Sequence, residues 1–150
     1  MPVKTEYLFR GTTKGFEGGT NSKENKFTCT SRHPVIALFF AMDCAREYPD
    51  DAVVYIAKIE DVQHLKAEPN VFKKIEQEFV VRVAPTEFYK HTVGYIHFKD
   101  LQEILKEIGF DVSQIVRKDN LTELCKNVKQ LKAKQLETLI KQIQSVMKTN

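Results

Sequence analysis

The sequence predicts an α+β protein, with a core of two packed β-sheets and one buried helix followed by C-terminal helices. Short runs of aromatic and β-branched residues, separated by segments that contain Gly or Pro, are typical of strands and fill much of residues 1–98. From Asp100 onward the apolar residues follow helical spacing instead. A chain of 150 residues has the length of one domain, in which we distinguish a core, 1–98, from a helical C-terminal extension packed on it, 99–150.

The first strand is predicted over 7–10 (YLFR) and ends at Gly11. Residues 11–26 contain four of the six glycines and almost no apolar side chain, so we expect a loop. A second strand is predicted over 27–30. The helix predicted over 34–47 is apolar on nearly every side through Met42 and should be buried, with Ser31 as its cap and Pro34 in its first turn.

The later elements are predicted in the same way. The run AVVYIAKI over 52–59 shows little alternation and is typical of a central strand. The stretch 61–74 has no firm pattern, whereas EFVVRV over 78–83 predicts a strand, and strand pieces are expected at 86–89 and 93–98. Apolar residues between 101 and 108 form a helical stripe that ends at Gly109, and a second helical series runs from 121 to 146.

The charge of the chain is concentrated at its end. Residues 1–118 contain 17 basic and 17 acidic side chains, while residues 119–150 contain six Lys against three acidic residues, so this segment carries 6 − 3 = +3. That charge is weak for a nucleic-acid tail, which needs clustered Lys and Arg, and a solvated helix face accounts for it as well. If the extension binds a macromolecule, we expect a target or inhibitor protein.

Neither a membrane segment nor a disulfide framework is expected. The N-terminus lacks the apolar run of a signal peptide, and the longest apolar run, 35–42, is far shorter than the roughly 20 residues of a membrane helix. Cys29, Cys44 and Cys125 form no CxxC pair, and no His lies near them at zinc-ligand spacing. We therefore expect no metal, no membrane partner and a cytoplasmic location.

Two segments place polar side chains at strand ends. Arg10 ends the first predicted strand, where its guanidinium can bind a phosphate or carboxylate, and Gly11 beside it leaves space for a ligand at the backbone. Cys29, Thr30 and Ser31 offer small hydrogen-bonding groups where the second strand meets the buried helix. Each segment taken alone is more often structural than functional.

A third segment brings two carboxylates to the start of a strand. Glu76 and Glu78 lie two residues apart, so they share a face if both are in the strand that follows. Two carboxylates on one face repel each other, and such a pair is typical of a site that holds a cation or stabilises developing positive charge. An exposed strand edge is the ordinary alternative for this pattern.

Taken in this order, the three segments resemble those of the R-S-E class of mono-ADP-ribosyltransferases over about residues 5–98. FRGTT is similar to the family's aromatic-Arg-Gly strand, and EQEF to its E-x-E motif. FTCTSRHPVIALFFA is similar to its Ser-Thr-Ser strand and the helix that follows, except that Cys29 replaces the first Ser. The helical residues 99–150 lie outside the resemblance.

The resemblance implies NAD as substrate, without a metal, in a glycosyl-transfer reaction. Arg10 would hold the phosphate or nicotinamide ribose, with Gly11 and Thr12 beside it. Cys29, Thr30 and Ser31 would line the nicotinamide pocket. Glu78 would bond the ribose 2′-hydroxyl, and Glu76 would engage the incoming nucleophile. The acceptor stays open between a protein side chain (arginine or another), nucleic acid and a small molecule. The family also includes toxins delivered into a host cytosol.

Two other interpretations stay open. The first is a binding module of the same fold with weak or no activity, because a thiol is a poorer hydrogen-bonding group than the family's hydroxyl. The second is a hydrolase in which Cys29 is the nucleophile and His33 is its base, since a Cys near a helix N-terminus can have a lowered pKa.

Overall fold

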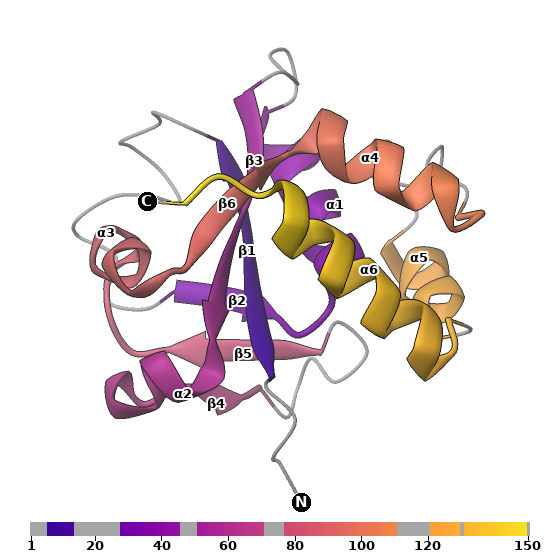
Figure 1. The fold of residues 1–150 in the computed structure, drawn as a ribbon. Helices are drawn as coiled ribbons and strands as arrows, with labels where there is room; N and C mark the ends of the chain where they lie inside the picture. Colours follow the sequence, from indigo (N-terminus) through magenta and orange to yellow (C-terminus); the bar gives the residue numbers. More distant parts are fainter. Residues whose placement is uncertain are drawn as a thin grey trace, which may run out of the picture.

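A computed structural model describes residues 6–13, 28–45, 51–70, 77–110, 121–129 and 131–149. Within these ranges the fold is α+β, as expected, and six strands form a single antiparallel sheet in the order β4-β5-β2-β1-β3-β6 (Figure 1). The prediction of two packed sheets is therefore wrong, because the strands form one hydrogen-bonded sheet, with β1, β3 and β6 as one half and β2, β4 and β5 as the other. The strands are β1 Tyr7–Thr13, β2 Thr28–Ser31, β3 Ala52–Lys58, β4 Glu68–Pro69, β5 Glu78–Val81 and β6 Gly94–His97.

Helices follow several of these strands. The longer ones among the described residues are α1 Pro34–Ala45, α4 Phe98–Glu107, α5 Leu121–Val128 and α6 Ala133–Val146. Short turns of helix are α2 Ile59–Val62, η3 Gln63–Leu65, α3 Pro85–Phe88 and η5 Tyr89–His91. In the described part of the chain, no helix combines the length and the apolar character that crossing a membrane requires.

The sheet changes direction between β1 and β2. β1 and β3 pair along their whole length, from Tyr7↔Lys58 to Thr13↔Ala52, whereas β1 and β2 are joined only at Phe9↔Ser31. β2 and β5, in turn, are paired along their whole length. Figure 1 shows β2 and β5 running across β1 rather than along it. β1 and β2 therefore separate on either side of this pair. Beyond it, the backbone groups of β2 that face β1 are not hydrogen-bonded to β1 as in a regular ladder.

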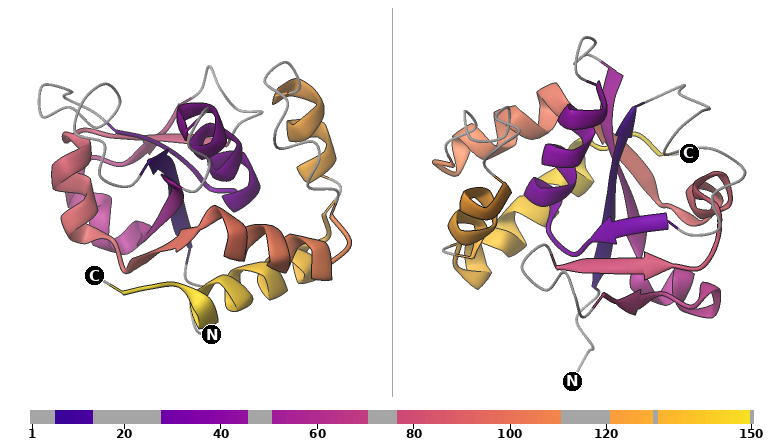
Figure 2. Two further views of the ribbon diagram at one scale, coloured as in Figure 1. Left: turned by 90° about the horizontal axis from the view of Figure 1, so that it is seen from above. Right: turned by 180° about the vertical axis from the view of Figure 1, so that it is seen from behind.

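Two hydrophobic cores lie on opposite faces of the sheet. The larger core contains Phe9 of β1 with residues of α1, α4, α5 and α6, and Figure 2 shows these helices gathered on one side of the sheet. The second core joins Leu8 and Ala57 to Val81 of the other half and to Phe88 of α3. The two halves of the sheet thus fold toward each other on the face away from α1.

The C-terminal helices are part of the larger core. Leu101 and Leu105 of α4 and Leu139 and Ile143 of α6 belong to the same buried cluster as Phe9. The chain then returns to the sheet, where the N–H and C=O of Lys148 exchange hydrogen bonds of 2.8 and 2.9 Å with Tyr95 of β6. Residues 99–150 therefore help to form the core.

Most predicted elements are present, with one error of type. α1 is buried from Pro34 to Phe39, as expected, but Phe40 is exposed, and β1 continues past Gly11 to Thr13. The strand piece predicted at 86–89 is wrong, because α3 begins at Pro85. Ala84 has an extended backbone and its carbonyl accepts the first helical hydrogen bonds, so Pro85 takes the first helical position, where its missing N–H costs nothing.

Candidate active site

Ser31 and Glu78 are direct partners in the β2–β5 pair. Both side chains are buried, with 3% and 8% of their surface exposed. Residues directly opposite each other in an antiparallel pair direct their side chains to the same face, so the hydroxyl and the carboxylate share one face of the sheet. The second and third sequence motifs therefore meet here.

Arg10 joins this pair from β1. Its neighbour Phe9 is the partner of Ser31, and its guanidinium donates a hydrogen bond from Nη1 to the backbone oxygen of Cys29, at 3.0 Å. Strand alternation places Arg10 on the face opposite Phe9. Its guanidinium therefore reaches β2 where the β1–β2 ladder has ended. The three motifs thus lie on three neighbouring strands, β1, β2 and β5.

Ser31 is held in place by the helix that follows it. Its Oγ accepts a hydrogen bond from the His33 N–H at 3.1 Å, and Nδ1 of His33 accepts one from the Val35 N–H at 3.2 Å. These side chains satisfy backbone donors that have no partner within the first turn of α1. The side chain that caps α1 is therefore that of His33, directly before Pro34, rather than the predicted Ser31, and the hydrogen bond from His33 restrains the serine beside Glu78.

The environment of His33 bears on the proposed cysteine nucleophile. Burial lowers the pKa of this histidine from 6.5 to about 4, so the ring is neutral at pH 7. Nδ1 is occupied by the Val35 N–H, and Nε2 has no hydrogen-bond partner among the described residues. Neither ring nitrogen is bonded to the Cys29 thiol, so the structure gives a Cys–His hydrolase no support.

Gly11 is required for packing. A Cβ at this position would lie 1.7 Å from the backbone oxygen of Ala37 and 2.7 Å from the backbone nitrogen of Ala41. α1 therefore occupies the space that the sequence suggested for a ligand. Two small residues one helical turn apart allow the helix to approach β1 this closely.

The remaining predicted residues are placed as follows. Thr12 is fully buried, and the Thr30 hydroxyl donates to the backbone oxygen of Phe79 at 3.0 Å, so Thr30 links β2 to β5. Cys29 is partly exposed. Glu76 lies outside the described residues. Within the described ranges, no three His, Cys, Asp or Glu side chains are grouped as metal ligands would be.

A tyrosine cluster beside Arg10 was not predicted. Tyr55 lies opposite Arg10, on β3. The ring of Tyr55 stacks on that of Tyr89, with ring centroids 4.2 Å apart, and the ring centroid of Tyr95 lies 5.6 Å from that of Tyr55. All three side chains are half-buried. Burial, with smaller contributions from Tyr89 and Tyr95, raises the pKa of Tyr55, so its hydroxyl stays protonated at neutral pH. A planar ring can stack on such a surface.

No sequence signal indicates this cluster. Its tyrosines come from β3, η5 and β6, and only the strand register and the turn after α3 bring them together. A comparison of the chain with known proteins found no match among family models, curated proteins or solved structures.

Proposed function

We propose that this protein is a mono-ADP-ribosyltransferase, which cleaves the nicotinamide–ribose bond of NAD and transfers ADP-ribose to an acceptor macromolecule. The observation that carries the proposal is the pairing of Ser31 with Glu78, with Arg10 bonded to the same strand. The three motifs of the R-S-E resemblance thus lie on three neighbouring strands of one sheet, where Arg10 reaches the backbone of β2 from the face opposite Ser31 and Glu78.

The chemistry requires a carboxylate at this position. Loss of nicotinamide builds positive charge on the ribose, as in glycoside cleavage. A fixed carboxylate stabilises that charge more than the neutral ground state, and this difference accelerates the reaction. Glu78 meets the requirement because it is largely buried and has little contact with screening water. Its hydrogen bond to the ribose 2′-hydroxyl would hold the sugar in place.

The neighbouring groups have separate tasks in this proposal. Ser31, restrained by its hydrogen bond from His33, keeps a hydroxyl beside the carboxylate. Arg10 donates to the backbone oxygen of Cys29, which holds its guanidinium beside β2, and this positive charge would attract the NAD phosphates. The tyrosine cluster, on the same face of the sheet as Arg10, offers a stacking surface for a ring bound on that side.

The test is the release of nicotinamide from NAD by the Glu78→Gln variant. The amide keeps the shape of the side chain and removes its charge, so we expect a loss of at least about 100-fold. Glu68→Gln is the matched control, because Glu68 lies on the adjoining strand β4 in an exposed ion pair with Arg82, 3.1 Å long. It should cleave NAD as the unaltered protein does. Circular dichroism and melting curves establish that both variants are folded.

Two outcomes would contradict the proposal. Cleavage of NAD by Glu78→Gln at the unaltered rate would remove Glu78 from the mechanism. Binding of NAD in calorimetry without any nicotinamide release would favour the binding module. That alternative stands because the partly exposed thiol of Cys29 replaces the family's serine.

A further inference from the structure

A pocket of about 280 Å³ opens beside the strand ends that carry Ser31 and Glu78. Arg32 and Gln77, the next residue after Ser31 and the one before Glu78, line one wall, and the Arg32 N–H donates to the Gln77 carbonyl at 3.0 Å. Tyr7 lines the pocket from β1, on the same face as Phe9. The pocket thus lies on the face of the sheet to which the register assigns Ser31 and Glu78.

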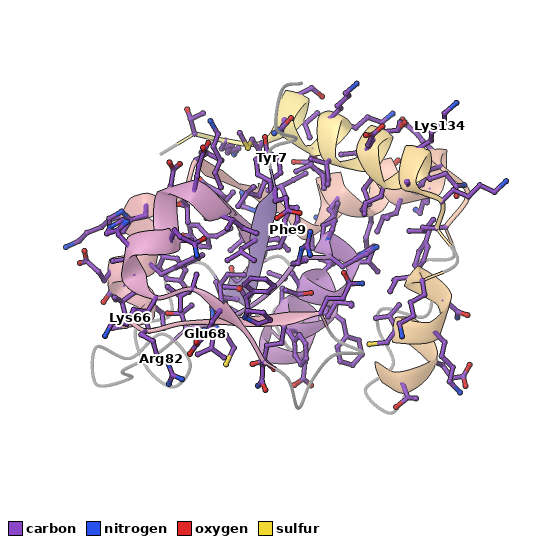
Figure 3. All side chains as sticks on the ribbon, turned by 90° about the horizontal axis from the view of Figure 1, so that it is seen from below. Tyr7, Phe9, Lys66, Glu68, Arg82 and Lys134 are labelled. Carbon is purple, nitrogen blue, oxygen red and sulfur yellow. The ribbon has the colours of Figure 1, made fainter. Side chains whose placement is uncertain are left out.

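The opposite wall of this pocket belongs to α6. Leu136, Glu137 and Ile140 project from one face of the helix, and Gln144, one turn further, donates a hydrogen bond to the Tyr7 hydroxyl. Figure 3 shows Tyr7 close to α6, with Phe9 further along β1. A helix outside the resemblance therefore forms part of a pocket at Gln77, the residue that precedes Glu78.

The lining of the pocket restricts what can enter it. Leu136, Ile140 and the Tyr7 ring are apolar, while Glu6 pairs with Arg32 at 2.6 Å and Glu137 adds a second carboxylate. Two acidic groups and one basic group leave a formal charge of 1 − 2 = −1. Surfaces that bind nucleic acid are strongly positive, so a phosphodiester chain is disfavoured here. The volume is below the roughly 300–1,000 Å³ of small-molecule sites and suits one side chain.

The backbone at Gln77 is the second unusual feature. Its φ is +52°, in the left-handed region that non-glycine residues rarely adopt. Such strain persists where the surrounding structure maintains it, and it is concentrated at functional sites. Here the left-handed residue is itself part of the wall of the pocket, directly before Glu78.

We propose that this pocket binds the acceptor side chain of a polypeptide substrate, so that α6 selects the acceptor. This inference rests on the proposed transferase function. The acceptor's apolar stem would lie along Leu136 and Ile140, and its reacting atom would approach Glu78 past Gln77. α6 is then the specificity element of the enzyme, and NAD cleavage itself does not depend on it.

The experiment separates cleavage from transfer. Nicotinamide release without acceptor reports cleavage, and labelled NAD with core histones or with single-stranded DNA reports transfer to protein or to nucleic acid. Glu137→Lys reverses a charge at the pocket. Glu123→Lys makes the same change on α5, where Glu123 has an exposed contact of 3.8 Å with Lys126, and it is the matched control. Leu136→Gln tests the apolar wall, with a melting curve to confirm folding.

We expect Glu137→Lys and Leu136→Gln to lower histone labelling at least about tenfold with unchanged nicotinamide release, and Glu123→Lys to change neither. Normal histone labelling by both pocket variants would overturn the inference, and so would label on the DNA alone or on neither probe. An unaltered protein that releases no nicotinamide would refute the transferase function itself, and the acceptor pocket with it.

Discussion

Ser31 and Glu78 lie opposite each other on β2 and β5, and the same serine accepts a hydrogen bond from the His33 N–H at the start of α1. One small side chain thus connects the candidate catalytic strand to the buried helix. α1 in turn packs on β1 over Gly11, next to Arg10. The position of the site therefore depends on how closely this helix approaches the sheet.

Gly11→Ala tests this dependence. Because the added Cβ would lie 1.7 Å from a backbone oxygen, helix and strand must move apart, and we expect a loss of about 3 kcal/mol in the free energy of unfolding. Gly109→Ala is the comparison, since it meets no atom within 4 Å and is strained only by its φ of +84°, which costs about 1–2 kcal/mol. Urea denaturation measures both. Equal losses would show that α1 does not restrict this position.

Cys29→Ser restores the residue of the Ser-Thr-Ser pattern. The thiol is a weak hydrogen-bonding group, so a hydroxyl should leave NAD cleavage unchanged or raise it. Arg10 bonds the backbone oxygen at this position, which the substitution keeps. The measurement is the rate of nicotinamide release. A loss of more than about tenfold, or roughly 1.4 kcal/mol of barrier, would mean that the thiol has a role of its own.

His33 should make stability depend on pH. Its pKa in the folded protein is about 4, below the ordinary 6.5, so the unfolded chain binds more protons between these values. The contribution of His33 to the free energy of unfolding is therefore fully present above pH 6.5. It decreases by roughly 3 kcal/mol in total as the pH falls toward 4. His33→Asn keeps an acceptor for the Val35 N–H and removes the titration. Urea denaturation from pH 7 to pH 4 should give a shallower slope for the variant, and parallel curves would contradict the assignment.

Gln77→Gly separates backbone strain from side-chain function. A non-glycine residue in the left-handed region is strained by about 1 kcal/mol, and substitution by glycine removes this strain. Glycine also gives the unfolded chain more conformational freedom, which offsets part of the gain in stability. Lys66→Gly is the matched control, because Lys66 has a φ of +60° and lies away from α6 (Figure 3). Both variants should melt within a few degrees of the unaltered protein, and only Gln77→Gly should lose transfer to histones. Equal transfer by the two variants would remove the Gln77 side chain from acceptor binding.

Local patterns predicted most of the elements, because spacing, caps and turn residues act over a few positions. The apolar run after Ser31 forms the buried α1, and the stripe that begins at Leu101 lies in α4. The segment 86–89 was assigned incorrectly because four residues cannot distinguish a strand from a helical turn. Burial of Phe88 in the second core, together with Pro85 at the first helical position, favours the turn.

The sequence by itself determined the α+β class, the order of most elements and the residue types from which a site could be built. Only the tertiary structure decided which of them meet, because strand register and helix packing join residues far apart in the chain. It paired Ser31 with Glu78, set Tyr55 beside Arg10, covered Gly11 with α1 and made α6 a wall of the pocket beside Gln77. Contacts of this kind form because distant segments bury apolar surface against each other, and a short stretch of sequence does not show which segments these are.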